Sequence, residues 1–107
     1  MSILQSVKIM LGIPEDHTAF DAQLIMHINS VFTILDQLGA RSFTITGSDE
    51  TWDDYFVDED YKKQEIIKSY IPMKVRMMFD TPTGSVATSF EKMISEYEWR
   101  IKVGEES

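Results

Sequence analysis

The chain of 107 residues has no cysteine, only three prolines and few basic residues. The absence of cysteine excludes disulfides, thiolate metal sites and cysteine nucleophiles. Ten lysines and arginines stand against 18 aspartates and glutamates, which gives a formal net charge of −8. Sequence-independent binding to nucleic-acid phosphates needs clustered basic residues, so this charge balance argues against it.

Long apolar runs are also missing. No stretch approaches the roughly 20 apolar residues that a membrane-spanning helix needs. The first eight residues, MSILQSVK, lack the basic segment followed by a long apolar one that marks a signal peptide. We therefore expect a soluble protein of a reducing cytoplasm. Its length suits one domain over residues 1–107, with a flexible polar tail over about residues 103–107.

Apolar residues at helical spacing dominate what is present. The clearest pattern is the second predicted helix, which Thr18 and Asp21 begin as a capping box and Gly39 ends. Its apolar stripe recurs every three or four residues and is expected to face the core. The predicted helices span about residues 3–11, 19–38, 60–79 and 85–102, and the last one is expected to bury Val86, Phe90, Met93, Tyr97 and Ile101.

An extended segment interrupts this pattern after the second helix. In residues 40–50, Phe43 and Ile45 alternate with serine and threonine, which predicts a short strand or an extended arm. Thr51 and Asp54 have the spacing of a capping box around a short helical turn. The expected fold is all-α: a compact bundle of about four helices, with one extended arm or short strand between the second and third.

The third predicted helix contains Pro72 within its most apolar stretch, IKSYIPMKVRMMFD. Helical counting places Pro72 in a narrow polar stripe with Glu65, Ser69 and Arg76. Proline removes one backbone hydrogen bond and bends a helix away from itself, so an outward-facing proline predicts a kinked central helix. The alternative is two helices that meet at Tyr70–Ile71, because the residue before proline disfavours helix.

Groups that could carry catalysis are scarce. The only histidines, His17 and His27, have no partner at metal-ligand spacing, and the sequence has neither a phosphate-binding glycine loop nor a nucleophile elbow. The acidic segment Asp49–Asp60 lacks the Asp-x-Asp-x-Asp-Gly order of a calcium loop and is interrupted by aromatic residues. We expect no enzyme, no catalytic residue, no cofactor and no metal ion.

Two apolar residues fall outside the predicted core faces. Trp99 lies opposite the apolar stripe of the last helix, and Met26 lies on the polar back of the second. Tryptophan is enriched where interfaces gain most of their binding energy, so contact of Trp99 with another molecule is one hypothesis. The alternative is that Trp99 packs under the N-terminal helix or the arm.

Five short motifs in this order and spacing resemble the small head–tail connector proteins of long-tailed bacteriophages and prophages. They are LGI (11–13), INS (28–30), ETWDD (50–54), KVRxxFDxP (74–82) and EWR (98–100). The resemblance extends over about Ile3–Ile101. Pro72 departs from the family, in which the third helix normally contains no proline, and this puts the straightness of that helix in doubt.

The resemblance implies an all-α structural adaptor of the virion neck rather than an enzyme. Such adaptors form a ring of identical subunits, usually twelvefold, on the portal protein of a DNA-filled capsid. The ring extends the DNA channel and docks the next neck or tail-completion protein. The resemblance also implies assembly in the host cytoplasm, no membrane partner, and DNA that passes through without specific binding.

Two surfaces follow as hypotheses. Each subunit of a ring needs two different contact patches. A channel wall must also let DNA slide past, and like charge discourages adhesion of phosphates, although simple solubility explains the acids equally well. The candidate subunit contacts are Met26, Phe43, Ile45 and Trp99, and the candidate channel residues are Asp49, Glu50, Asp53, Asp54, Asp58, Glu59 and Asp60.

A second class of function fits the same acidity: a small DNA mimic that inhibits a nucleic-acid-binding enzyme by occupying its basic groove. The acids of such a mimic should follow a whole face, as phosphates follow a strand. Here they concentrate between Asp49 and Asp60. Competition with DNA for DNA-binding proteins would separate the two classes.

Overall fold

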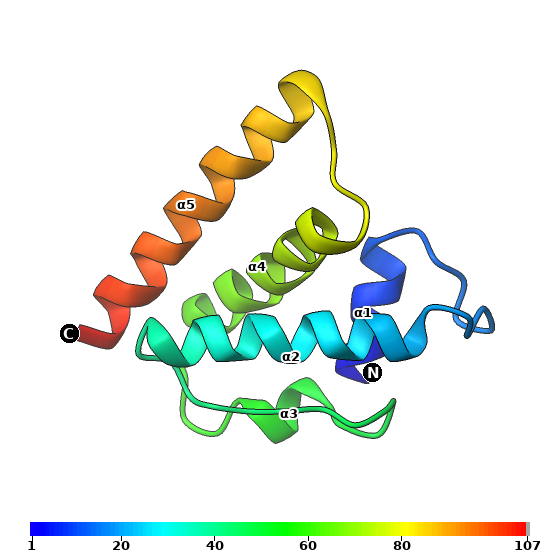
Figure 1. Ribbon diagram of the computed structural model, residues 1–107. Coiled ribbons are helices and arrows are strands. Elements are labelled where there is room, and N and C mark those ends of the chain that lie inside the picture. The colour runs from blue at the N-terminus through cyan, green and yellow to red at the C-terminus, as the bar shows by residue number, and fades with distance from the viewer. Residues whose placement is uncertain (107) are drawn as a thin grey trace.

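Helices α2 and α4 pack against each other at the centre of the molecule (Figure 1). Helix α1 contacts both of them, and α5 packs along α4. The structure, a computed structural model, describes the backbone of residues 1–106 and the side chains of residues 1–104. The helices in this part are α1 (Ile3–Met10), α2 (Asp21–Gln37), α3 (Trp52–Tyr55), α4 (Tyr61–Phe79) and α5 (Gly84–Glu106).

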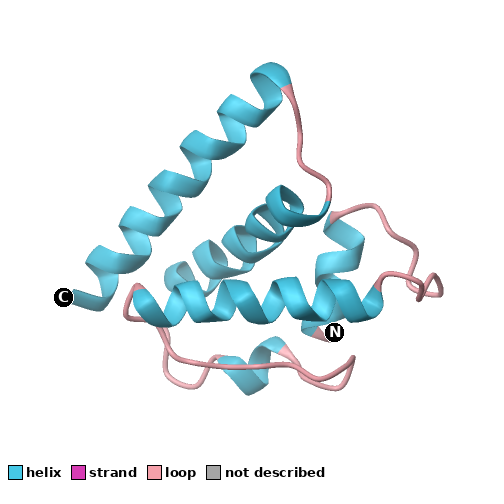
Figure 2. Cartoon of the chain, viewed as in Figure 1, coloured by secondary structure: helices cyan, strands magenta, loops and turns pink. Residues whose placement is uncertain are grey.

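The predicted all-α fold is confirmed. Residues 1–106 contain helices and loops but no strand (Figure 2). The segment predicted as a short strand or extended arm, residues 40–50, has neither helix nor strand, and its residues 41–46 lie beside α2. One isolated bridge joins Ser2 to Thr51. Backbone N–H of Ile3 also donates to the carbonyl of Glu50 at 2.9 Å, so the start of α1 is tied to the segment that precedes α3.

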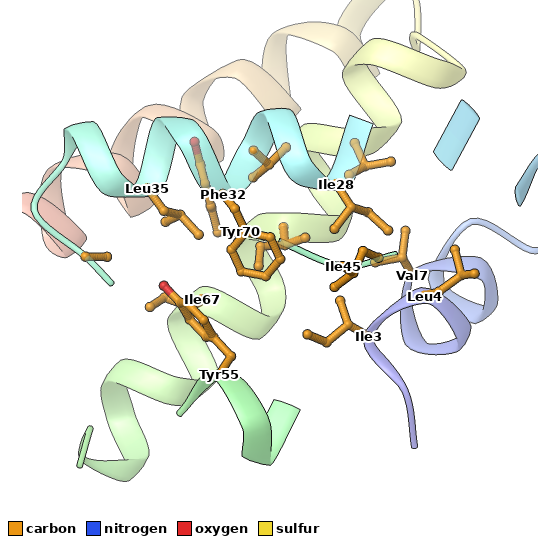
Figure 3. Packing of buried hydrophobic residues seen from close by; sticks show 14 of the residues in the cluster. Ile3, Leu4, Val7, Ile28, Phe32, Leu35, Ile45, Tyr55, Ile67 and Tyr70 are labelled. Atoms are coloured by element: carbon orange, nitrogen blue, oxygen red, sulfur yellow. The ribbon is translucent and has the colours of Figure 1, made fainter. Parts of the chain in front are cut away.

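The core forms where the apolar faces of α1, α2 and α4 meet. Figure 3 shows Phe32 and Leu35 of α2 near Ile67 and Tyr70 of α4. Ile45 of the arm belongs to the same core and lies towards α1. All five side chains are at most 2% exposed. Burial of this apolar surface is the main term that stabilises the fold.

Local capping signals set most helix starts. Ser2 caps α1 by accepting from the Gln5 backbone N–H at 3.1 Å. Thr51 and Asp54 form the predicted capping box around α3, and Asp60 caps α4 by accepting from the Lys63 N–H at 2.8 Å. Each such cap satisfies backbone donors that the first helical turn leaves free.

The predicted capping box of α2 is wrong. The helix begins at Asp21 rather than after Thr18, and its N-cap, Phe20, makes no side-chain cap. The Asp21 carboxylate turns towards Lys8 of α1 instead, at 2.9 Å. An ion pair with a distant residue has therefore replaced the local cap.

The predicted outward position of Pro72 is also wrong. Helix α4 runs without interruption from Tyr61 to Phe79, which excludes two helices meeting at Tyr70–Ile71, but Pro72 is buried. Met10 of α1 and Phe90 of α5 line the surface beside it. Helical spacing places Pro72 among polar residues, but it does not show that α1 and α5 lie against that side of α4.

Helix α5 differs from its prediction at both ends. Towards its first residues it diverges from the rest of the molecule (Figure 1), so Val86 and Met93, predicted as core, are 50% and 45% exposed. Ile101 is buried as predicted, and Ile94, which was not predicted as core, is buried as well. Residues 103–106 of the predicted tail belong to the helix, and Ser107 lies outside the described residues.

Candidate interaction surfaces

The acidic segment Asp49–Asp60 contributes caps as well as charge. Asp54 accepts from the Thr51 N–H at 2.9 Å, Glu59 accepts from the Val57 N–H at 2.9 Å, and Asp60 caps α4. Glu50 accepts from backbone N–H groups of the preceding turn. Four of the seven candidate channel acids therefore hold their own loop in place.

The remaining three acids, Asp49, Asp53 and Asp58, have exposed side chains. None of the three forms a hydrogen bond or ion pair with the side chains or backbone that the structure describes. They form one class of available negative charge, distinct from the capping acids.

Glu50 shows how tightly the capping acids are held. Its carboxylate accepts from the Thr46 N–H at 2.8 Å, from the Thr46 hydroxyl at 2.9 Å and from the Gly47 N–H at 3.4 Å. Desolvation raises the pKa of this carboxyl, but the hydrogen bonds outweigh it and leave the pKa below its usual value. Glu50 is therefore a fixed part of the turn.

The four candidate subunit contacts divide into two pairs. Met26 and Trp99 are 61% and 65% exposed, on α2 and α5. Ile45 is 2% exposed within its own chain, and Phe43 is half-buried against Phe32, with ring centroids 5.4 Å apart. Only Met26 and Trp99 therefore present their side chains fully to another molecule.

Asn29 of α2 fixes the arm and was not singled out as a functional residue. Its amide Nδ2 donates to the Ile45 carbonyl at 2.9 Å, and its Oδ1 accepts from the Ile45 N–H at 2.7 Å. These two hydrogen bonds satisfy the Ile45 backbone as a neighbouring strand would. The alternation of Phe43 and Ile45 suggested an extended segment, but nothing local to the segment pointed to Asn29.

A groove of about 280 Å³ opens beside α1, and the sequence did not suggest it. Met1, Ile9 and Met10 are the exposed apolar residues of its lining, which Trp52 and Pro72 extend. One signal was available: α1 buries Ile3, Leu4 and Val7 and still carries two further apolar residues, Ile9 and Met10, which are exposed. A short helix that is apolar on two sides indicates a second contact.

The groove has a fixed wall. Trp52 Nε1 donates to the Ser6 hydroxyl at 3.0 Å and stacks on Phe56, with ring centroids 6.0 Å apart. Lys68 of α4 lines the same groove and places its ammonium 6.0 Å from the Phe56 ring centroid. Asp53 lies where the groove continues past Trp52 and Lys68.

The sequence matches the family model described as phage connector protein over residues 3–107. The chain belongs to this family. No curated protein and no solved structure gives a significant match. The family match covers nearly the whole chain and confirms the resemblance to phage head–tail connectors.

Family membership gives this connector a structural role in the virion neck, in association with other head or tail proteins. The family is a structural one, which favours the connector interpretation over the DNA-mimic inhibitor. In the described part of the connector, no three His, Asp or Glu side chains are grouped to hold a metal ion. None of the described helices combines the length and apolar character needed to cross a bilayer.

Two buried tyrosines join the elements that carry these surfaces. The Tyr55 hydroxyl donates to the Arg41 carbonyl at 3.0 Å, and the Tyr70 hydroxyl donates to Glu98 at 2.7 Å. Burial, helped by the nearby Glu59 charge, raises the pKa of Tyr55 to about 12, and burial also raises the pKa of Tyr70. Both phenols therefore stay neutral donors in the folded connector.

Proposed function

We propose that this connector forms a ring on the portal protein of the capsid, extends the DNA channel and docks the next neck or tail-completion protein. The observation that carries the proposal is the pair of unlike exposed surfaces on a chain with a closed core. One is Trp99 on α5, and the other is the apolar groove beside α1. A ring of identical subunits uses two different patches in this way.

Within this proposal, Met26 and Trp99 contact neighbouring molecules directly. Phe43 and Ile45 act indirectly, because their side chains hold the arm against α2 while Ser42 and Thr44 are exposed. Assembly would take place in the host cytoplasm, before or while the neck is completed. A twelvefold ring, as in most members of the family, is the stoichiometry proposed for the virion.

Native mass is the first test of the ring. Light scattering over a concentration series, with negative-stain images of the heaviest fraction, should show closed rings, either in free solution or on portal-bearing, DNA-filled heads. Hydrophobic burial at the contacts supplies the driving force, so assembly should increase with concentration. Heads that take up no connector at saturating concentration, together with a monomer in solution, would contradict the proposed function.

The acidic segment is proposed to border the channel through its three available carboxylates. Neutralising them in an Asp49→Asn, Asp53→Asn, Asp58→Asn variant should slow DNA passage, because phosphates would no longer be repelled by the wall. Folding stability should change by less than about 0.5 kcal/mol, since these are surface substitutions. The measurement is the rate of DNA ejection from particles assembled with the variant.

A matched control uses the capping acids. Asp54→Ala and Asp60→Ala remove the same amount of negative charge per site, but they also delete the caps of α3 and α4 and should cost stability as well. Ejection at the wild-type rate from particles that carry the triple variant would show that the acids serve solubility alone.

A further inference from the structure

We infer that Trp99 of one connector copy docks into the groove beside α1 of a second copy, and that this head-to-tail contact builds the ring. The inference rests on the proposed function and names its partner surfaces.

The first surface is the outer side of α5. Trp99 is 65% exposed and makes no ring contact or hydrogen bond with any described residue. Lys92 and Ser95 precede it by seven and four positions, so they lie on the same side of the helix, and Lys102 lies next to that side. The result is an aromatic side chain between two lysines, on the side of α5 turned away from buried Ile94 and Ile101.

The second surface is the groove between α1, α3 and α4. Its volume of about 280 Å³ suits one large aromatic side chain. Met1 and Met10 are flexible and polarisable, so they can adapt to an inserted ring. The hydrogen bond to Ser6 holds Trp52, so this part of the groove is ordered before docking. Less conformational entropy is therefore lost on binding.

Charge distinguishes a second copy from other occupants. Residues 1–60 contain 11 acidic and two basic residues, whereas residues 61–107 contain seven acidic and eight basic ones. The first part therefore has a net charge of −9 and the second +1, so a contact between the first part of one copy and the second part of the next avoids bringing two acidic parts together. Lys92 and Lys102 flank Trp99 on α5, and Asp53 lines a hollow that shares Met1, Trp52 and Lys68 with the groove. Lys68 is placed to contact the face of an inserted indole.

The geometry of the two surfaces gives a chain of contacts rather than a closed pair. Trp99 and the groove are different patches on different helices, so docking one of each leaves one of each free. Repetition of such a contact closes a ring where the rotation between subunits allows it. Because Asp53 borders the groove and also belongs to the acidic segment, the contact would lie next to the proposed channel wall.

Cysteine cross-linking tests the inference cleanly because the chain has no cysteine of its own. Ser95→Cys places a thiol one helical turn before Trp99, and Met10→Cys places one at the groove. After oxidation of the two variants mixed together, we expect a covalent dimer that neither variant forms alone. A chain carrying both substitutions should give a ladder of larger species at the same concentrations.

Two controls connect the cross-link to Trp99. Adding Trp99→Ala to the Ser95→Cys chain should lower the cross-linked yield by about tenfold or more, with an unchanged thermal unfolding midpoint because the side chain is exposed. Val86→Cys, exposed on the same helix but away from Trp99, should not link to Met10→Cys. Equal linking by Val86→Cys, or no linking by Ser95→Cys at any concentration, overturns the inference.

This outcome is separable from failure of the proposed function. Rings seen on portal-bearing heads, with no Ser95–Met10 cross-link in them, would mean that the ring uses other surfaces. A cross-linked ladder from a connector that never binds such heads would keep the contact and reject the proposed function.

Discussion

Replacing Asp21 by alanine should lower the free energy of unfolding by about 3 kcal/mol. Lys8 is only 2% exposed, its Nζ lies 2.9 Å from Asp21 Oδ1, and its one hydrogen bond within the described residues goes to the Glu15 carbonyl at 2.9 Å. The contact with Asp21 is an ion pair rather than a well-directed hydrogen bond. Removing the carboxylate leaves a buried ammonium without a counter-charge. Urea denaturation followed by circular dichroism measures the change.

Two comparisons isolate the ion pair. Asp16→Ala removes an exposed carboxylate from the same loop and should change stability by less than about 0.5 kcal/mol. The double variant Lys8→Met, Asp21→Ala should recover most of the loss, because a buried ion pair replaced by apolar groups is often neutral. A double variant as unstable as Asp21→Ala would place the effect at the start of α2, where a carboxylate also interacts with the helix dipole.

The predictable part of this fold is the part governed by local signals. Ser2, Thr51 and Asp60 each cap the helix that follows, and the Thr51 cap was predicted from the sequence alone. The core stripe of α2 and the span of α4 also follow from helical spacing, which depends on neighbours three or four positions away. Such patterns need no knowledge of the rest of the chain.

The errors share a different cause: each depends on a distant helix. Asp21 had a plausible local partner in Thr18 and pairs with Lys8 instead. Pro72 lies in a polar stripe and is buried because α1 and α5 line that side of α4. Val86 belongs to a regular apolar stripe and is exposed because α5 diverges from the molecule at that end. Periodicity shows that a face is apolar and does not show what covers it.

The same limit applies to the interaction surfaces. Trp99 stands out in the sequence because it interrupts a polar face, and the structure leaves it exposed. The groove beside α1 combines residues from three separate segments, so no local motif describes it. Of the seven acids of the acidic segment, the sequence predicted a capping role for Asp54 alone, yet Glu50, Glu59 and Asp60 also accept from backbone N–H groups. The composition shows that the surface is acidic. The structure shows which acids hold the loop in place and which are exposed without a partner in the described residues.

Asn29→Ala should destabilise the connector by about 2–4 kcal/mol, through the arm rather than through α2 itself. The side chain supplies both hydrogen bonds to the Ile45 backbone, at 2.7 Å and 2.9 Å, and Ile45 is 2% exposed. Without the Asn29 amide, the N–H and the carbonyl of Ile45 have no partner beside the core. Keeping Ile45 buried then costs the desolvation of both groups. Hydrogen exchange of the Ile45 amide reports the effect at its source, and urea denaturation reports its total size.

Ser30→Ala is the matched control, because Ser30 is the next residue of α2, is exposed, and donates only to the Met26 carbonyl within its own helix. It should leave both measurements unchanged within about 0.5 kcal/mol. Asn29→Asp keeps the acceptor for the Ile45 N–H and loses the donor, so exchange at Ile45 should stay slower than in Asn29→Ala. Wild-type protection of Ile45 in Asn29→Ala would show instead that Arg41 and Tyr55, which bind the start of the arm to α3, suffice to hold it. In either case contacts with α2 and α3 position the arm, and the exposed side chains of Ser42 and Thr44 keep their positions only while those contacts persist.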